Sequence, residues 1–258
     1  MENIKKMIEE KSIFRVIKND KNNAKNNMAI DEALFSCFKE NDKPILRVYN
    51  WTKSFTVGVS QDFKDYSSNE ETKDFKDDYA KRITGGGVLF HGHDLSYSLV
   101  IPSHLLGESN IKKSYEKICS FILTFYKNLG LDAKFAKDDE NVILSKNEYC
   151  QVGFEAYDIL VNSKKIGGNA QKRTRKLIFQ HGSIPLKSKK SVDNSLIYDK
   201  KIGYTLEDFN INIDFEEAKI KLIESFHETF NVDLIYSSLT TEENEKKNKL
   251  LKDKYDYK

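Results

Sequence analysis

Two residues in the middle of the chain have the types that nucleophilic, covalent catalysis needs. Cys150 lies in the polar stretch 147–153, whereas Cys37 and Cys119 fall on apolar helical stripes and are expected to be inert core residues. A cysteine becomes a nucleophile when a nearby cation lowers its thiol pKa, and Lys165 lies in a later predicted strand. The strand and turn between them permit Lys165 to return beside Cys150. From these residues alone, an incidental surface cysteine stays an open alternative.

Glycine is scarce in this chain, and its placement is uneven. Seven of the 12 glycines fall in or just after two short stretches: Gly85, Gly86, Gly87, Gly92, Gly167, Gly168 and Gly182. Glycine lets a backbone approach a ligand closely, so such clusters mark special backbone requirements. The first cluster precedes a predicted strand and not a helix, which argues against a phosphate loop. Tight strand turns would explain either cluster alone, but two clusters flanked by Arg, Lys or His favour a ligand site.

Charge excludes some function classes and draws attention to arginine. The 42 basic and 40 acidic residues give a net charge of +2 and are interleaved, which argues against a nucleic-acid-binding protein. Only five basic residues are arginines: Arg15, Arg47, Arg82, Arg173 and Arg175. Because lysine is the default cation here, an arginine indicates a position where the planar guanidinium matters. Three of the five lie in the two glycine-rich segments.

The remaining pattern predicts a mixed α+β fold with mainly antiparallel pairing and flanking helices. Helices are expected over 24–40, 111–129 and 214–230, with Asn26 or Asn27 as the first N-cap and Gly130 ending the second. Strands are expected over 45–50, 54–60, 88–91, 94–102, 141–145, 155–162, 164–171 and 177–186. Asn162 and Ser163 form a predicted hairpin turn. Residues 61–78 are expected to be a loop or a surface helix.

The chain shows no domain boundary, so we expect one domain over 1–258, with a core at about 13–235 and a charged, partly disordered tail at about 240–258. No segment has the length and apolarity of a membrane span or a signal peptide. Three widely spaced cysteines argue against a disulfide framework and for a reducing compartment, so we expect a cytoplasmic protein. We also expect it to be a monomer. No cluster has metal-ligand spacing, and we expect no metal.

Several motifs, in order, closely resemble the lipoate/octanoate protein ligase and transferase family. They are residues 81–91 (KRITGGGVLFH), 94–98 (DLSYS), 164–173 (KKIGGNAQKR) and 180–184 (QHGSI), with 27–33 and 46–51 also fitting. The resemblance covers about residues 13–235. It implies the α+β catalytic domain shared with biotin protein ligases, and an enzyme that transfers an octanoyl or lipoyl group to one lysine of a small carrier domain.

Within that family, the Cys150 to Lys165 spacing resembles that of the cysteine-type protein octanoyltransferases. The resemblance implies that Cys150 takes the octanoyl group from octanoyl-acyl carrier protein as a thioester, with Lys165 favouring the thiolate and the developing charge. The acceptor would be a lipoyl carrier domain, such as glycine cleavage H protein or a dehydrogenase E2 subunit. No cofactor is implied, since a thioester is already activated.

The same resemblance implies a set of substrate-binding residues in both glycine segments. They are Arg82, Gly85, Gly86, Gly87, His91, Tyr97, Gly167, Gly168, Ala170 and His181. Val88, Phe90 and Leu99 are, with Tyr97, candidates for an apolar tunnel. His181 could line the site or merely orient a strand.

Two other members of the family stay open as alternatives. An ATP-dependent lipoate-protein ligase would use an acyl-adenylate, ATP and Mg²⁺ and no cysteine, and Gly85, Gly86 and Gly87 look like the ligase form. The stretch after Cys150 also lacks the Phe and Pro usual in the cysteine branch. The short chain beyond residue 190 argues against the accessory domain that ligases carry. A lipoyl or octanoyl amidotransferase relay would use the same cysteine chemistry.

Overall fold

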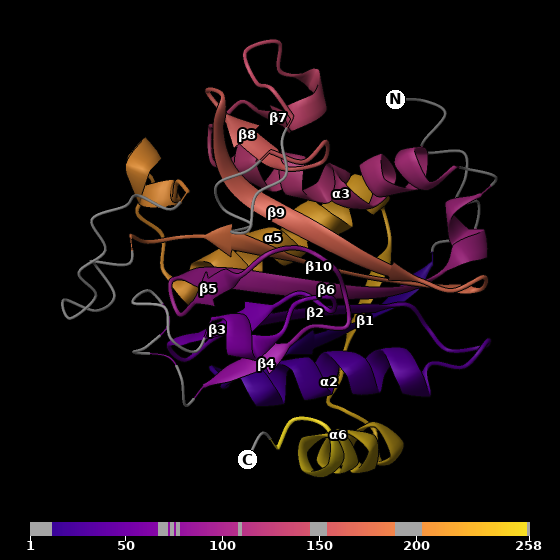
Figure 1. The fold of residues 1–258 in the computed structure, drawn as a ribbon. Coiled ribbons are helices and arrows are strands. Elements are labelled where there is room, and N and C mark those ends of the chain that lie inside the picture. Colours follow the sequence, from indigo (N-terminus) through magenta and orange to yellow (C-terminus); the bar gives the residue numbers. More distant parts are fainter. Residues whose placement is uncertain are drawn as a thin grey trace.

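The computed structural model describes residues 12–66, 72, 75, 78–107, 110–144, 154–188 and 203–256, so Cys150 lies outside the described residues. The described chain centres on an eight-stranded sheet in the order β11-β1-β2-β6-β10-β9-β8-β7 (Figure 1). Its strands are β1 (Ile13–Lys18), β2 (Ile45–Asn50), β6 (Asp94–Pro102), β7 (Ala133–Phe135), β8 (Ile159–Val161), β9 (Lys164–Arg173), β10 (Leu177–Pro185) and β11 (Asp233–Tyr236).

Pairing in this sheet is mainly antiparallel, as predicted. The parallel pairs are those of β1 with β2 and with β11. A three-stranded sheet in the order β4-β3-β5 lies beside it, made of β3 (Ser54–Val57), β4 (Tyr79–Lys81) and β5 (Leu89–His91). This mixed α+β architecture confirms the expected fold class.

Helices cover both faces of the large sheet (Figure 1). One face packs against α3 (Ile111–Asn128) and α5 (Phe215–Phe230), where Leu95, Tyr97 and Leu99 of β6 join Phe121 of α3 and Phe226 of α5 in the main core. The other face packs on α2 (Ala24–Cys37). Alternate β6 residues therefore point to opposite layers, which decides which side chains reach a site.

The predicted helices are present, with small differences at their ends. Helix α2 begins after Asn23, whose side chain accepts a hydrogen bond from the Asn26 N–H, so the predicted caps were wrong by three or four residues. Gly130 follows α3 at φ +80°, and Asn162 and Ser163 form the β8–β9 turn, as expected. Cys119 is buried as expected, but Cys37 is partly exposed near the end of α2.

The charged tail differs from its prediction. Residues Thr241–Asp253 form α6, which begins with a capping box between Thr240 and Glu243. Arg15 pairs with Glu243 at 2.7 Å, and Tyr255 is fully buried against α2. A cap, an ion pair and a few apolar anchors therefore suffice to order a segment whose composition predicts disorder.

Other differences are local. Residues 141–144 are not a strand, and the prediction did not include β1, β4, β7 or β11. Within 61–78, the described Tyr66 and Phe75 are buried against Phe55 and Phe90, so this segment covers the small sheet. No helix among the described residues has both the length and the apolar character needed to cross a bilayer.

Candidate active site

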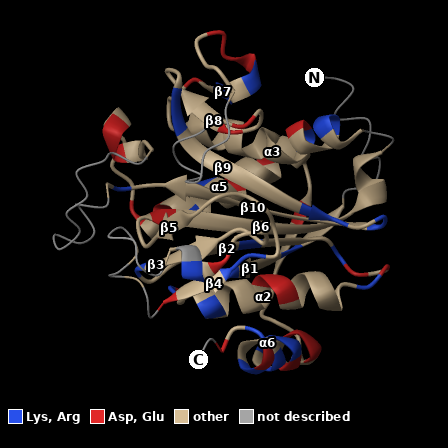
Figure 2. Ribbon diagram, viewed as in Figure 1, with Lys and Arg blue, Asp and Glu red and all other residues tan. Residues whose placement is uncertain are grey.

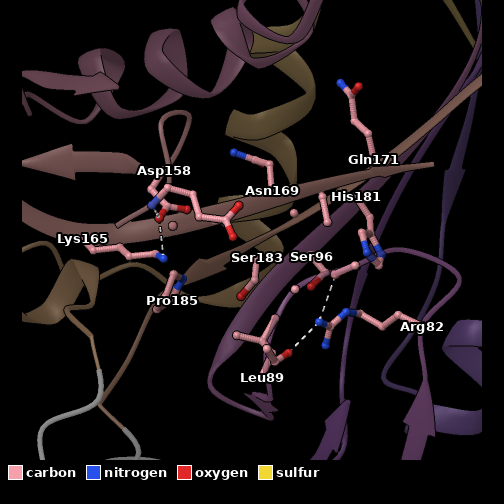
Figure 3. Close-up of a pocket in the computed structure, with 18 of the residues that line it drawn as sticks. Arg82, Leu89, Ser96, Asp158, Lys165, Asn169, Gln171, His181, Ser183 and Pro185 are labelled. Carbon is pink, nitrogen blue, oxygen red and sulfur yellow. Dashed lines mark hydrogen bonds and ion pairs between the residues drawn. The ribbon is translucent and has the colours of Figure 1, made fainter. Parts of the chain in front are cut away.

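A cavity of about 410 Å³ opens between the glycine loop 85–87 and strands β9 and β10 (Figure 3). The predicted residues that line it are Arg82, Gly85, Gly86, Gly87, His91, Lys165, Gly167, Gly168, Ala170 and His181. Tyr97 is not among the lining residues. Its side chain is on the α3 face of the sheet, where its hydroxyl donates to Asn169 Oδ1 at 2.6 Å.

The expected apolar tunnel is also built from other residues. Val88 and Phe90 pack in the small-sheet cluster, and Leu99 packs in the main core. The apolar lining of the cavity includes Met28, Tyr49, Trp51, Leu89 and Ile166. Strand alternation explains the difference around β5, because Leu89 faces the cavity whereas Val88 and Phe90 on either side of it point into the small-sheet core.

Lys165 is held at the cavity by a carboxylate that sequence reasoning missed. Lys165 Nζ lies 2.5 Å from Asp158 Oδ2, and both residues are buried (Figure 3). The backbone N–H of Glu155 donates to the same oxygen at 2.7 Å. Burial raises the pKa of Asp158 to about 6, although the nearby Lys165 charge acts in the opposite direction.

The hairpin register explains how these two side chains meet. In β8 and β9, Ile159 pairs with Gly167, so Asp158 continues toward Gly168. A methyl group on Gly168 would lie 3.3 Å from Asp158 Oδ1 and 3.8 Å from Lys165 Cε. Glycine at 168 thus leaves room for the ion pair. The turn at Asn162 and Ser163 was predicted, but counting back across it pairs Lys165 with Leu160, and the register shift between Ile159 and Leu160 hides the approach of Asp158.

Gly182 has a similar role on the neighbouring strand. A Cβ atom there would overlap the Asn169 amide oxygen and the Tyr97 ring. The absent side chain lets Tyr97 reach Asn169 between two strands. Asn169 also lines the cavity and is a second residue that sequence reasoning missed.

Arg82 and His91 belong to a hydrogen-bonded network under the glycine loop. Arg82 donates to the Gly87 carbonyl at 2.6 Å, to the Gly85 carbonyl at 3.3 Å and to Thr56 Oγ1 at 2.8 Å. His91 Nε2 lies 2.9 Å from the same hydroxyl, and its ring stacks on Trp51 at 3.8 Å. The Arg82 guanidinium therefore fixes the shape of the loop.

Asp94 anchors the other side of His91, with its Oδ2 2.9 Å from His91 Nδ1. Burial alone would raise the pKa of Asp94, but His91 and neighbouring donors lower it to about 2. Asp94 therefore stays ionised at neutral pH and orients the His91 ring.

His181 connects the cavity to a second buried network. Its Nε2 lies 2.7 Å from Thr84 Oγ1, and its Nδ1 lies 3.7 Å from Asp31 Oδ2. Burial lowers the pKa of His181, so the imidazole is neutral at pH 7. Asp31 is itself held by Arg47 at 2.7 Å, and although burial opposes this, that charge keeps the pKa of Asp31 below its usual value.

The structure therefore gathers nearly all described candidates of the two glycine segments around one cavity. They provide a cation, a neutral imidazole and a backbone-lined wall. In the part of the chain that the structure describes, no group of three or more His, Cys, Asp or Glu residues could hold a metal ion.

Comparison with known proteins identifies the family of this chain. Residues 23–227 match the family described as Lipoyl protein ligase A/B catalytic domain. A protein of Anoxybacillus flavithermus named Octanoyltransferase LipM is 30% identical, covering 96% of this chain and 97% of that protein. A protein of the same name from Clostridioides difficile is 27% identical over 88% and 90% of the two chains.

Solved structures show the same fold. A lipoate-protein ligase A structure bound with ATP superposes with a TM-score of 0.75 at 24% identity, covering 95% of this chain and 96% of that one. A putative lipoate protein ligase from T. acidophilum with bound lipoic acid gives a TM-score of 0.74 at 24% identity, over 95% and 96% of the two chains. The chain belongs to the lipoyl protein ligase A/B catalytic domain family.

Proposed function

We propose that this protein is an octanoyltransferase that moves an octanoyl group from octanoyl-acyl carrier protein, through a thioester on Cys150, to the acceptor lysine of a lipoyl carrier domain. The relatives named Octanoyltransferase LipM support the reaction class. The observation that carries the proposal is the buried Lys165 ammonium at the cavity, fixed by Asp158 at 2.5 Å. A cation held in that way suits an acyl transfer in which negative charge develops on oxygen.

In the first half-reaction, the Cys150 thiolate attacks the carbonyl carbon of the donor thioester. A new C–S bond forms to Cys150, the donor C–S bond breaks, and the departing thiolate takes up the proton that Cys150 lost. Lys165 Nζ donates a hydrogen bond to the carbonyl oxygen as charge develops there. The same positive charge favours the thiolate form of Cys150.

In the second half-reaction, the neutral amine of the acceptor lysine attacks the Cys150 thioester. The amide bond forms as the Cys150 thiolate leaves, and the amine proton restores the thiol. The acyl group is already activated as a thioester, so the proposed reaction needs no ATP.

The lining of the cavity suits an apolar acyl chain. Its inner wall includes Met28 and Trp51, each only 2% exposed, with Tyr49 and Leu89. An octanoyl chain that displaces water from such a wall gains the free energy of apolar burial. The glycine loop, braced by Arg82, allows the backbone to approach that chain closely.

The direct test is intact mass spectrometry of the purified protein incubated with octanoyl-acyl carrier protein and no ATP. We expect a thiol-labile octanoyl adduct on the wild type and none on Cys150→Ala. Cys37→Ala is the matched control, because Cys37 is partly exposed on α2, and it should be acylated like the wild type.

The proposal is wrong if the wild type gains no adduct or if Cys150→Ala gains the same one. Octanoyl transfer that requires ATP, Mg²⁺ and free octanoate, and that survives Cys150→Ala, would indicate a lipoate-protein ligase. Acylation by an octanoylated carrier domain, but not by acyl carrier protein, would indicate the amidotransferase relay.

A further inference from the structure

Arg173, at the end of β9, is a half-buried cation that lines the cavity. Its Nη1 donates to Ser114 Oγ at 2.7 Å and to Gln171 Oε1 at 3.1 Å. Among the described residues, no carboxylate pairs with it, and its Nε and Nη2 groups have no hydrogen-bond acceptor. Burial lowers the pKa of Arg173, but the guanidinium stays charged at neutral pH.

An unpaired, half-buried charge is costly in a folded protein unless a ligand compensates it. A lysine at position 173 would avoid this cost, because its flexible side chain could extend the charge into solvent. Lysine is also the usual cation of this chain, at 37 of the 42 basic residues. An arginine with two free donors is instead suited to an anion with several oxygens, such as a phosphate group.

The two ends of the cavity differ in the way that a long amphipathic ligand requires. The inner end is enclosed by apolar residues such as Met28 and Trp51. At the outer end Ile111 is 66% exposed. Three exposed lysines are its neighbours or those of Arg173 in the sequence: Lys112, Lys113 and Lys172. Figure 2 shows basic residues at the ends of both α3 and β9 in this part of the molecule. The Arg173 to Ser114 hydrogen bond ties these two ends together.

The edge of β9 offers a path between these ends. Strand β8 pairs only with the first residues of β9, up to Gly167, so beyond that point β10 is the single described strand paired with β9. The Cα atoms of Lys165 and Arg173 are eight residues apart on β9, which corresponds to about 26 Å at about 3.3 Å per residue of extended strand. The Lys165 side chain runs along the strand toward Asn169, which shortens this span (Figure 3).

We infer that Arg173 forms a phosphate subsite, which binds the phosphodiester of the donor's phosphopantetheine arm while the thioester lies at Lys165. The inference rests on the proposed function, because only a thioester donor of that kind carries a phosphate at the far end of a long chain. The arm would lie along β9 past Tyr115, whose hydroxyl donates to the Asn169 carbonyl at 2.7 Å, and the octanoyl chain would fill the apolar inner end. A nucleotide phosphate is the other source of the same chemistry, and the test separates the two.

The test compares two small thioester donors in the absence of ATP: octanoyl-4′-phosphopantetheine and octanoyl-pantetheine, which lacks the phosphate. The rate of Cys150 acylation is followed by intact mass. For the wild type, we expect kcat/KM to favour the phosphorylated donor about tenfold, the size of one charge-assisted contact at a partly exposed site. Arg173→Gln should bring this ratio close to one. Arg175→Gln is the matched control, because Arg175 is exposed and does not line the cavity, and it should keep the wild-type ratio.

A wild-type ratio near one overturns the subsite, and so does an equal loss of preference in Arg175→Gln. The wild-type comparison stands even if Arg173→Gln does not fold. In addition, inorganic phosphate should inhibit competitively with the phosphorylated donor only. If neither donor acylates the wild type, the proposed function has failed; if both do so equally, only the subsite has failed. An Arg173→Gln variant that instead weakens ATP use in an octanoate-plus-ATP assay would assign the phosphate to a nucleotide and overturn the inference.

Discussion

Two buried carboxylates lie beside the same cavity and have opposite electrostatic environments. Asp94 faces His91 Nδ1 at 2.9 Å, Ser183 Oγ at 2.7 Å and the Gly92 N–H at 3.2 Å, and its pKa is lowered to about 2. Asp158 has Lys165 and one backbone N–H, and burial raises its pKa to about 6. Asp94 has more hydrogen-bond donors, which stabilise its negative charge. Asp158 has fewer donors, so its ionised form is less stable.

This difference separates a supporting network from a reactive pair. The Asp94, His91 and Arg82 network fixes the glycine loop and is satisfied without a ligand. The Asp158 and Lys165 pair lies at the cavity with a perturbed pKa, which is the pattern expected where chemistry takes place.

Removing the Lys165 charge should have the largest effect on activity. We expect Lys165→Gln to lower the acylation rate about 10²-fold to 10³-fold, which is the usual effect of losing one oxyanion-stabilising donor. Lys164→Gln is the control, because Lys164 is exposed and its Nζ lies over the Tyr204 ring. Equal loss in both variants would show that general charge, and not the position of Lys165, matters. The readout is single-turnover acylation followed by intact mass.

Asparagine at each carboxylate position should affect stability differently. Asp94 has a lowered folded-state pKa, so it contributes stability above about pH 4 that is lost as pH falls through about 2. Asp94→Asn should therefore lower the free energy of unfolding by about 2 kcal/mol at pH 7. Asp158→Asn should lower it much less or raise it, because the Asp158 charge is already unfavourable. Urea unfolding at pH 7 measures both, and a larger loss at 158 than at 94 would reverse the contrast.

The pH dependence of acylation should show Asp158 directly. With a raised folded-state pKa, Asp158 is protonated below about pH 6 and loses its ion pair with Lys165. Wild-type acylation should rise through pH 6 as that pair forms, and Asp158→Asn should lack this ionisation. In the wild type, this group should also make the free energy of unfolding decrease as the pH rises from about 4 to about 6, because the folded state holds the proton more tightly than the unfolded state. An unchanged acylation profile in Asp158→Asn would show that the pair does not govern the reaction.

The smallest expected effect is steric. Gly168→Ala places a methyl group 3.3 Å from Asp158 Oδ1, so we expect a loss of a few-fold in acylation with little change in stability. Gly85→Ala is the comparison variant, because a Cβ there meets no protein atom within 4 Å and could crowd only a bound acyl chain. If Gly85→Ala is the more damaging variant, space for the acyl chain at the glycine loop matters more than space for the Asp158 and Lys165 pair.

The periodic elements could be predicted from sequence, and most of the site could be predicted from the family motifs. Helix α3 and the turn at Asn162 follow from local pattern alone. Helix α6 was missed because composition outweighed the Thr240 to Glu243 capping box in a charged segment. Tyr97 was misplaced because its motif does not say which face of β6 points to the cavity. Asp158 depends on strand register, which periodicity cannot supply.

The thiol pKa of Cys150 tests most directly whether Lys165 activates this cysteine. The rate of Cys150 alkylation by iodoacetamide is measured against pH by peptide mass spectrometry. Within the same molecule, partly exposed Cys37 is the reference, and Cys119, whose pKa burial raises to about 12, should not react. We predict an apparent Cys150 pKa below the usual 8.5 that rises by about one unit or more in Lys165→Gln. A Cys150 pKa near about 8.5 in the wild type and unchanged in Lys165→Gln would contradict the activation of Cys150 by Lys165.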